Sequence, residues 1–206
     1  LLKGGQSEVG LRAAASHTGA MRTDARVFDA VCAQSGIVKV EQSMDLLDLA
    51  AAFSSLPLPK GGRVAIMTLG GGWGVITADL CARHGLTVAE LSPRLIARFD
   101  QILPKYWSRA NPVDIVGEPD NNLMTTIMEE LLQWDGCDAL INLGVLGRAL
   151  YFEGMAAAAQ RADPGYTKEF LDTAMSYMHT FEREYLKLVA RLMETYGKPV
   201  YGVSLQ

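Results

Sequence analysis

The sequence predicts an α/β protein of two domains, each built on a parallel β-sheet. Short apolar segments alternate with amphipathic segments of helical length along most of the chain, a pattern typical of βαβ units. A proline- and glycine-rich stretch, Leu-Pro-Leu-Pro-Lys-Gly-Gly at 56–62, interrupts this alternation and is typical of a linker. Since 49% of the 206 residues are hydrophobic, the chain has enough apolar surface for a substantial core.

The first domain is expected over 1–58. Its expected elements are the end of a strand at 1–2, a helix up to Gln34 capped by Thr23 or Asp24, a strand over 37–40, and a helix over 43–53 capped by Ser43. Apolar residues recur at helical spacing in both helices, and Gly36 provides a stop signal after the first.

The second domain is expected over 59–206. Its expected elements are strands over 63–68, 86–90, 139–143 and 199–205, and helices over 73–83, 93–103 with Ser92 as the cap, 121–134, and 167–196. The last helical stretch lies in a helical insertion at about 147–196. Its apolar residues follow a period of about 3.6, so we expect a packing surface there and no cofactor site.

Composition excludes several classes of protein. The net charge is −4 and the basic residues are scattered, so no nucleic-acid interface is expected. No apolar run approaches the roughly 20 residues that span a bilayer. The three cysteines are far apart and show no metal-ligand spacing. We expect a cytoplasmic protein without a metal site in this chain, and a piece of a longer one because both ends fall in strands.

The segment Ala-Ala-Ala-Ser-His-Thr-Gly-Ala at 13–20 places His17 among small residues. Small neighbours leave the imidazole accessible, and its ordinary pKa of about 6.5 leaves it partly neutral near neutral pH. Hydroxyls and backbone amides beside it suit an anion. The alternative is a surface-loop histidine without a function.

A second chemical signal is the glycine turn Thr-Leu-Gly-Gly-Gly-Trp-Gly at 68–74, between a buried strand and a helix. The start of a helix offers unpaired N–H groups and a partial positive charge, which favour an anion such as phosphate. Glu90 lies where a ribose-binding acid of a dinucleotide site would lie, but Val75 takes the place of that motif's third glycine. Tight packing of strand against helix is the alternative without a ligand.

Four segments together carry a family resemblance. They are Gly-Gly-Gln-Ser-Glu at 4–8, the histidine segment at 13–20, Val-Ala-Ile-Met-Thr at 64–68 with its glycine turn, and Ala-Asn-Pro-Val-Asp at 110–114. From residue 1 to about 145 the chain resembles the nucleoside-diphosphate-forming acyl-CoA synthetases, relatives of succinyl-CoA synthetase. The resemblance implies two flavodoxin-like three-layer domains, the first truncated.

The resemblance also implies a site. In this family an active-site histidine carries a phosphoryl group from an acyl phosphate to ADP, and His17 takes that position. The implied phosphate-binding residues are Ser16, Thr18, Gly19, Gly70, Gly71 and Gly72, at a site between the two domains. Asn111 and Asp114 either bind substrate or only fix their turn. Trp73 stands where relatives commonly have proline, and Glu8 is not expected to orient the histidine.

The resemblance implies that CoA and ATP or ADP with Mg²⁺ are bound mainly by other parts of the full enzyme, namely a CoA-binding Rossmann domain and an ATP-grasp domain or subunit. No group is expected to bind this piece tightly, and the piece alone is expected to be inactive. An oligomer is expected. The alternatives are a non-catalytic regulator or scaffold that keeps the fold, and a dinucleotide-binding oxidoreductase.

Overall fold

A computed structural model describes residues 1–5, 7–17, 24–116, 120–163 and 165–203. The chain divides into two compact units, Leu1–Leu56 and Pro57–Gln206, and each is described by itself. None of the described helices is long and apolar enough to cross a membrane.

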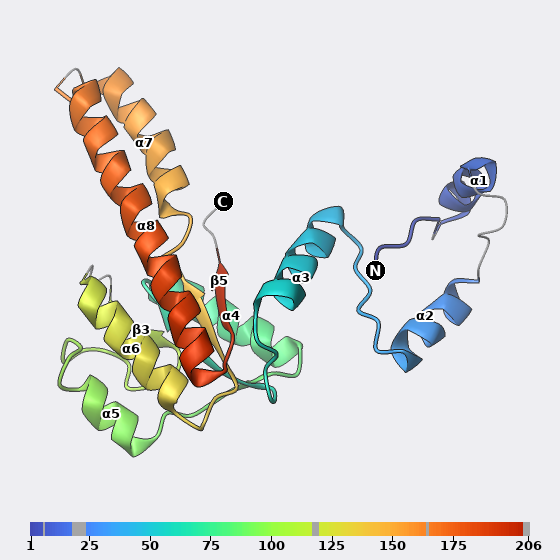
Figure 1. The fold of residues 1–206 in the computed structure, drawn as a ribbon, viewed down its shortest axis with the longest axis horizontal. Helices are drawn as coiled ribbons and strands as arrows, with labels where there is room; N and C mark the ends of the chain where they lie inside the picture. The colour runs from blue at the N-terminus through green and yellow to red at the C-terminus, as the bar shows by residue number, and fades with distance from the viewer. Residues whose placement is uncertain (6, 18–23, 117–119, 164, 204–206) are drawn as a thin grey trace. The chain divides into compact units, whose positions relative to one another are not determined.

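The first unit holds three helices among its described residues: α1 (Glu8–His17), α2 (Ala25–Gln34) and α3 (Ser43–Ser55) (Figure 1). The cap predicted at Asp24 is confirmed, since its carboxylate accepts the backbone N–H of Arg26 at 2.8 Å. The cap predicted at Ser43 is wrong. Ser43 is the first residue of α3, and Gln42 precedes it without a capping hydrogen bond from its side chain.

The strand predicted over 37–40 is reduced to a single parallel bridge between Leu2 and Val40. The N–H of Val40 donates to the carbonyl of Leu1 at 2.9 Å, and the ammonium of Leu1 donates to the carbonyl of Val38 at 2.6 Å. A strand exists only where a neighbouring strand pairs with it, and within the described part of this unit only residues 1–2 lie alongside.

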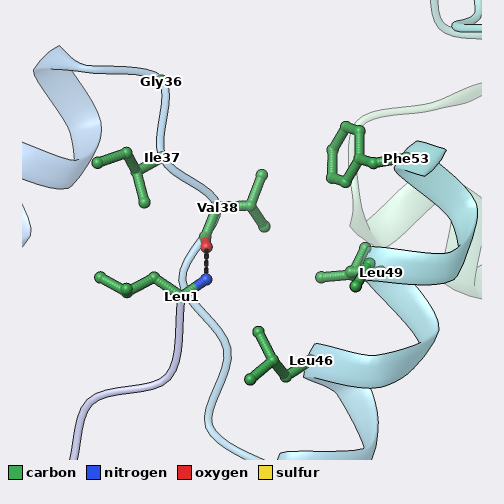
Figure 2. A pocket seen from close by; sticks show the side chains of 8 residues that line it. Leu1, Gly36, Ile37, Val38, Leu46, Leu49 and Phe53 are labelled. Atoms are coloured by element: carbon green, nitrogen blue, oxygen red, sulfur yellow. Dashed lines mark hydrogen bonds between the residues drawn. The ribbon is translucent and has the colours of Figure 1, made fainter.

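An apolar hollow of about 240 Å³ lies between this bridge and α3. Figure 2 shows the side chain of Val38 facing those of α3 across it, whereas the side chains of Leu1 and Ile37 extend to the other side of the backbone. The helix contributes Leu46, Leu49, Ala50 and Phe53. The apolar stripe predicted for this helix therefore lines a partly open surface, and Phe53 is 58% exposed.

The second unit is built on a parallel sheet. Its strands are β1 (Arg63–Thr68), β2 (Thr87–Val88), β3 (Val113–Asp114), β4 (Ala139–Leu143) and β5 (Val200–Val203). They are ordered β2-β1-β4-β5, and β3 pairs with the carboxyl end of β1. All pairs are parallel. This is the flavodoxin-like order, in which the first strand is central and the chain continues to both sides, so the predicted fold class is confirmed.

Helices cover both faces of the sheet. They are α4 (Gly71–Arg83), α5 (Pro93–Phe99), α6 (Asn121–Gln133), α7 (Arg148–Ala162) and α8 (Lys168–Tyr196). Alternate residues of β1 enter two separate cores: Val64 and Ile66 pack with Cys81 of α4, whereas Ala65 and Met67 pack with residues of α5, α6 and α8. A strand buried on both faces explains the nearly continuous apolar run of β1.

Several element ends differ from the predictions. The cap at Ser92 is confirmed, since its hydroxyl accepts the N–H of Leu95 at 3.3 Å. However, α5 ends at Phe99 and not at 103. Pro104 disfavours helical backbone at the residue before it, and the chain turns over 100–103 instead. The helix α4 begins at Gly71, two residues earlier than predicted.

The helical insertion forms a hairpin of α7 and α8, which pack along each other. Figure 1 shows that the far ends of both helices extend well beyond the sheet. The carboxyl half of α8 packs on the core through Tyr185, Val189 and Leu192.

The amino ends of β1 and β4 are joined by Arg63 and Asp138. The Asp138 carboxylate accepts three hydrogen bonds from Arg63, two from the guanidinium at 2.8 and 3.0 Å and one from the backbone N–H at 2.9 Å. These bonds, the guanidinium's first, lower the pKa of Asp138 from 3.8 to about 2. The carboxylate also explains Gly61, because a Cβ there would stand 2.6 Å from Asp138 Oδ2.

Candidate functional site

The glycine turn lies at the carboxyl end of β1, the edge of a parallel sheet where ligands bind in such folds. Thr68, the last residue of β1, is 1% exposed and fixes the turn. Its hydroxyl accepts the N–H of Gly70 at 3.1 Å and donates to the carbonyl of Gly70 at 2.8 Å. The chain then enters α4 at Gly71.

The first turn of α4 presents backbone donors to solvent. Within the described residues, the N–H groups of Gly71, Gly72 and Trp73 have no hydrogen-bond acceptor, and the first bond inside the helix runs from Gly74 to Gly70. Gly71 and Gly72 are exposed and carry no side chain that would cover these groups. The arrangement is therefore a bare, partly positive helix start, which favours an anion.

Asp114 borders this turn. Its Oδ1 accepts the N–H of Val116 at 2.8 Å, while its Oδ2 stands only 2.9 Å from the place where a Cβ on Gly71 would be. Glycine at position 71 is thus what lets the carboxylate approach the helix start. A negative charge is favourable there, so Asp114 neutralises part of the helix dipole that a bound anion would also use.

Asn111 lies behind the turn and is fully engaged with the backbone. Its Oδ1 accepts the N–H of Ile66 at 2.9 Å, and its Nδ2 donates to the carbonyls of Val64 and Ala89, each at 2.9 Å. The peptide bond that follows, Asn111-Pro112, is cis. For Asn111 these contacts favour the structural alternative over substrate binding.

Gly74 is a residue whose role the sequence alone did not reveal. It is buried, and a Cβ on it would stand 3.1 Å from both the Pro112 ring and the Thr68 methyl group. The helix can therefore pack directly on the ends of β1 and β3. The only signal in the sequence was a fourth glycine directly after Trp73. Trp73 is 54% exposed.

The histidine segment lies in the first unit. Residues 8–17 form α1, and His17 is its last residue. Alanine is the strongest helix former, and three alanines in succession explain the helix. The Ser16 hydroxyl donates to the carbonyl of Ala13 at 2.7 Å, so its proton is already engaged. Thr18 and Gly19 lie outside the described residues.

The site residues thus fall into two sets. The glycine turn, Asn111 and Asp114 are brought together in the second unit, while Ser16 and His17 lie in the first. Among the described residues no three carboxylate, histidine or cysteine side chains gather as metal ligands would.

Two family models match the chain in the same two parts. Residues 1–53 match the succinyl-CoA ligase like flavodoxin domain, and residues 64–147 match the ligase-CoA domain. The second match ends where the α7–α8 hairpin begins.

Relatives and a solved structure cover more of the chain. It is 34% identical to acetate–CoA ligase (ADP-forming) II subunit alpha of Pyrococcus furiosus, over 97% of this chain and 43% of that protein. It is 31% identical to 4-hydroxybutyrate–CoA ligase (ADP-forming) of Nitrosopumilus maritimus, over 85% of this chain and 25% of that protein. The dinucleotide forming acetyl-coenzyme A synthetase 1 of Ca. Korarchaeum cryptofilum, solved with phosphate and ADP, matches with a TM-score of 0.69 and 27% identity over 98% of this chain and 37% of that chain. The chain therefore spans less than half the length of these proteins.

Proposed function

Because the chain belongs to the nucleoside-diphosphate-forming acyl-CoA synthetase family, we propose that the protein it forms part of interconverts acyl-CoA, ADP and phosphate with a carboxylic acid, CoA and ATP. The resemblance in the two matched domains and the ADP-forming ligases among the relatives support this reaction class. A dinucleotide-binding oxidoreductase or a non-catalytic scaffold has no comparable support.

His17 is the proposed phosphoryl carrier. An acyl-CoA and phosphate first give an acyl phosphate and CoA. A neutral ring nitrogen of His17 then attacks the phosphorus, the bond from phosphorus to the acyl oxygen breaks, and the carboxylate leaves. In the second half, an oxygen of the ADP β-phosphate attacks the phosphorus, the bond from phosphorus to nitrogen breaks, and ATP forms.

The bare helix start at Gly71 and Gly72 is the observation that carries the proposal. Phosphate and phosphohistidine bear close to two negative charges near neutral pH, and unpaired N–H groups at a helix start stabilise such charge without rearrangement. Gly70 shapes the turn through Thr68, and Ser16, Thr18 and Gly19 add donors beside the histidine. Ser16 contributes its hydroxyl proton only after releasing the Ala13 carbonyl.

CoA, the nucleotide and Mg²⁺ are proposed to bind mainly to partner domains, a CoA-binding Rossmann domain and an ATP-grasp domain or subunit. The described residues do not offer Mg²⁺ a ligand set, so no step is assigned to a metal in this chain. The acyl group and the nucleotide base depend on those partners. We propose a cytoplasmic enzyme, in line with its nucleotide substrates.

The test is phosphoryl labelling of the full-length protein. Incubation with ATP labelled at the γ-phosphate and with Mg²⁺ is expected to give a phosphoprotein that is labile in acid and stable in base. His17→Ala and His17→Asn are expected to abolish the label. The matched control is His84→Ala, which removes an exposed histidine at the end of α4 and should label like the wild type. Absence of label in the wild type would overturn the phosphohistidine proposal.

A further inference from the structure

One oxygen of the Asp114 carboxylate stands at the start of α4 without a hydrogen-bond donor of its own. Its Oδ1 accepts the N–H of Val116 at 2.8 Å, whereas its Oδ2 has no hydrogen bond or ion pair with the residues that the structure describes. This second oxygen lies 2.9 Å from the place of a Cβ on Gly71. A full negative charge therefore stands beside the N–H groups that the proposed phosphate site uses.

The backbone around Asp114 fixes the carboxylate in this place. Asp114 pairs in register with Thr68 at the end of β1, and the N–H of the next residue, Ile115, donates to the carbonyl of Thr68 at 3.0 Å. The side chain of Ile115 is fully buried. Val116 then adopts a φ of 57°, a left-handed conformation that is unfavourable for a β-branched residue. The fold thus holds Asp114 at the helix start even at the expense of a strained turn.

An anion bound at the start of α4 is subject to two opposing forces. The unpaired N–H groups of Gly71 and Gly72 attract it, and the Asp114 carboxylate repels it. Even at the dielectric constant of water, a unit charge about 6 Å from a phosphate dianion weakens its binding by about ten-fold. A site built of donors alone would bind phosphate tightly in the ground state, and such binding adds to the barrier of the step that follows.

We propose that Asp114 limits the affinity of the glycine turn for phosphate by electrostatic repulsion. The inference rests on the proposed function, since it takes the turn at Gly70, Gly71 and Gly72 as the phosphate site. Asp114 is then neither a ligand of the anion nor only a turn residue. Its charge keeps phosphate exchangeable, so the donors of the turn are free to hold the anion during the reaction without trapping it before or after.

Calorimetric titration of the full-length protein with inorganic phosphate tests the proposal. Asp114→Asn removes the charge and keeps an oxygen that can accept the N–H of Val116, and Asp114→Ala removes the whole carboxylate. Both variants are expected to bind phosphate about ten-fold more tightly than the wild type. A residue with a purely structural role would leave the affinity unchanged or lower it. The matched control is Asp120→Asn, because Asp120 accepts the N–H of Asn122 at 2.8 Å in a similar turn. It should bind phosphate like the wild type.

Thermal unfolding gives a second measurement, in which the two effects of the charge have opposite signs. Without phosphate, both neutral variants of Asp114 should unfold at a slightly lower temperature, because the carboxylate no longer interacts with the dipole of α4. The same concentration of phosphate should then raise their unfolding temperature by more than that of the wild type, since a ligand that binds more tightly stabilises the fold more.

Two results would overturn the proposal. Phosphate affinity that is unchanged or lower in both variants would show that Asp114 does not repel the anion, or that it attracts it through a cation. A gain in Asp114→Asn alone would assign the effect to a new hydrogen bond from the amide. The titration involves no phosphoryl transfer, so its outcome is independent of whether His17 becomes labelled, and the two proposals can fail separately.

Discussion

The side-chain amide of Asn111 takes the place of a strand beside Ile66. It accepts the Ile66 N–H and donates to the Val64 carbonyl, each at 2.9 Å, at the edge of β1 between the points where β2 and β3 pair with it. A third bond reaches Ala89, just after β2. One side chain thus satisfies the polar groups of a gap between two short strands.

We expect Asn111→Ala to destabilise the second unit by roughly 2–4 kcal/mol, because buried N–H and carbonyl groups of β1 would lose their partners. The free energy of unfolding in urea measures the loss. Asn122→Ala is the control, since Asn122 is exposed near the start of α6, and it should cost less than about 0.5 kcal/mol. Equal effects of the two substitutions would contradict this role for Asn111.

Gly72→Ala is expected to preserve the fold and impair labelling of His17. Nothing lies within 4 Å of a Cβ at Gly72, so the helix tolerates alanine, yet the methyl group would stand among the donors of the proposed phosphate site. A rate of labelling lower by about ten-fold is expected, equivalent to about 1.4 kcal/mol. The matched control is Gly154→Ala, equally open in α7, which should not alter labelling. An unchanged rate of labelling in Gly72→Ala would show that the glycine turn does not contribute to the phosphate site.

Gly74→Ala is expected to destabilise the fold, unlike Gly72→Ala. Its Cβ would press on Pro112 and Thr68 at 3.1 Å, and such overpacking costs about 1–3 kcal/mol of stability. Thermal unfolding measures this loss. A variant as stable as the wild type would show that α4 shifts freely on the strands.

Asp138→Asn is expected to flatten the acid dependence of stability. The folded-state pKa of Asp138 is lowered from 3.8 to about 2, so its pairing with Arg63 stabilises the fold fully above about pH 4 and is lost as the pH falls through about 2. Unfolding free energies measured from pH 5 downward should fall less steeply for the variant in that window. Glu184→Gln is the control: Lys187 also lowers the pKa of Glu184, but this pair is exposed and screened by solvent, so the slope should change much less than in Asp138→Asn.

Tyr185→Phe should cost about 1–3 kcal/mol, because it removes the acceptor of a buried hydrogen bond from Asn142 Nδ2 at 2.7 Å. Burial raises the pKa of Tyr185, so the hydroxyl stays neutral. Asn142 Oδ1 has no partner among the described residues. The double variant Asn142→Leu with Tyr185→Phe should therefore regain most of the loss. Tyr196→Phe, whose hydroxyl bonds an exposed Glu129, is the matched control and should change stability little.

Much of the fold could be predicted from local patterns. The bounds of β1 and β4 were predicted correctly, because a strand buried on both faces leaves an unbroken apolar run between turn residues. The capping side chains of Asp24 and Ser92 marked helix starts. The element over 37–40 was predicted wrongly, because pairing depends on a neighbour that the local sequence does not contain.

The sequence predicted which residues lie at the site better than it predicted what each of them does. The motif at 110–114 includes Asn111, whose contacts are structural. The roles of Thr68 and Gly74 are evident only from their hydrogen bonds and packing at the turn. The small residues before His17 form a helix that ends at that residue, which the histidine motif itself does not indicate.

The sequence by itself determined the family, the alternation of strands and helices, and the glycine turn, because these depend on residue type and spacing along the chain. Only the tertiary structure decided that Asp114 lies against Gly71, that Asn111 bonds the backbone of β1 and of Ala89, and that Phe170 and Tyr177 on α8 are exposed. The contacts of Asp114 and Asn111 join residues 22 to 47 positions apart in the chain, and such contacts are set by packing of the whole unit and not by any local pattern.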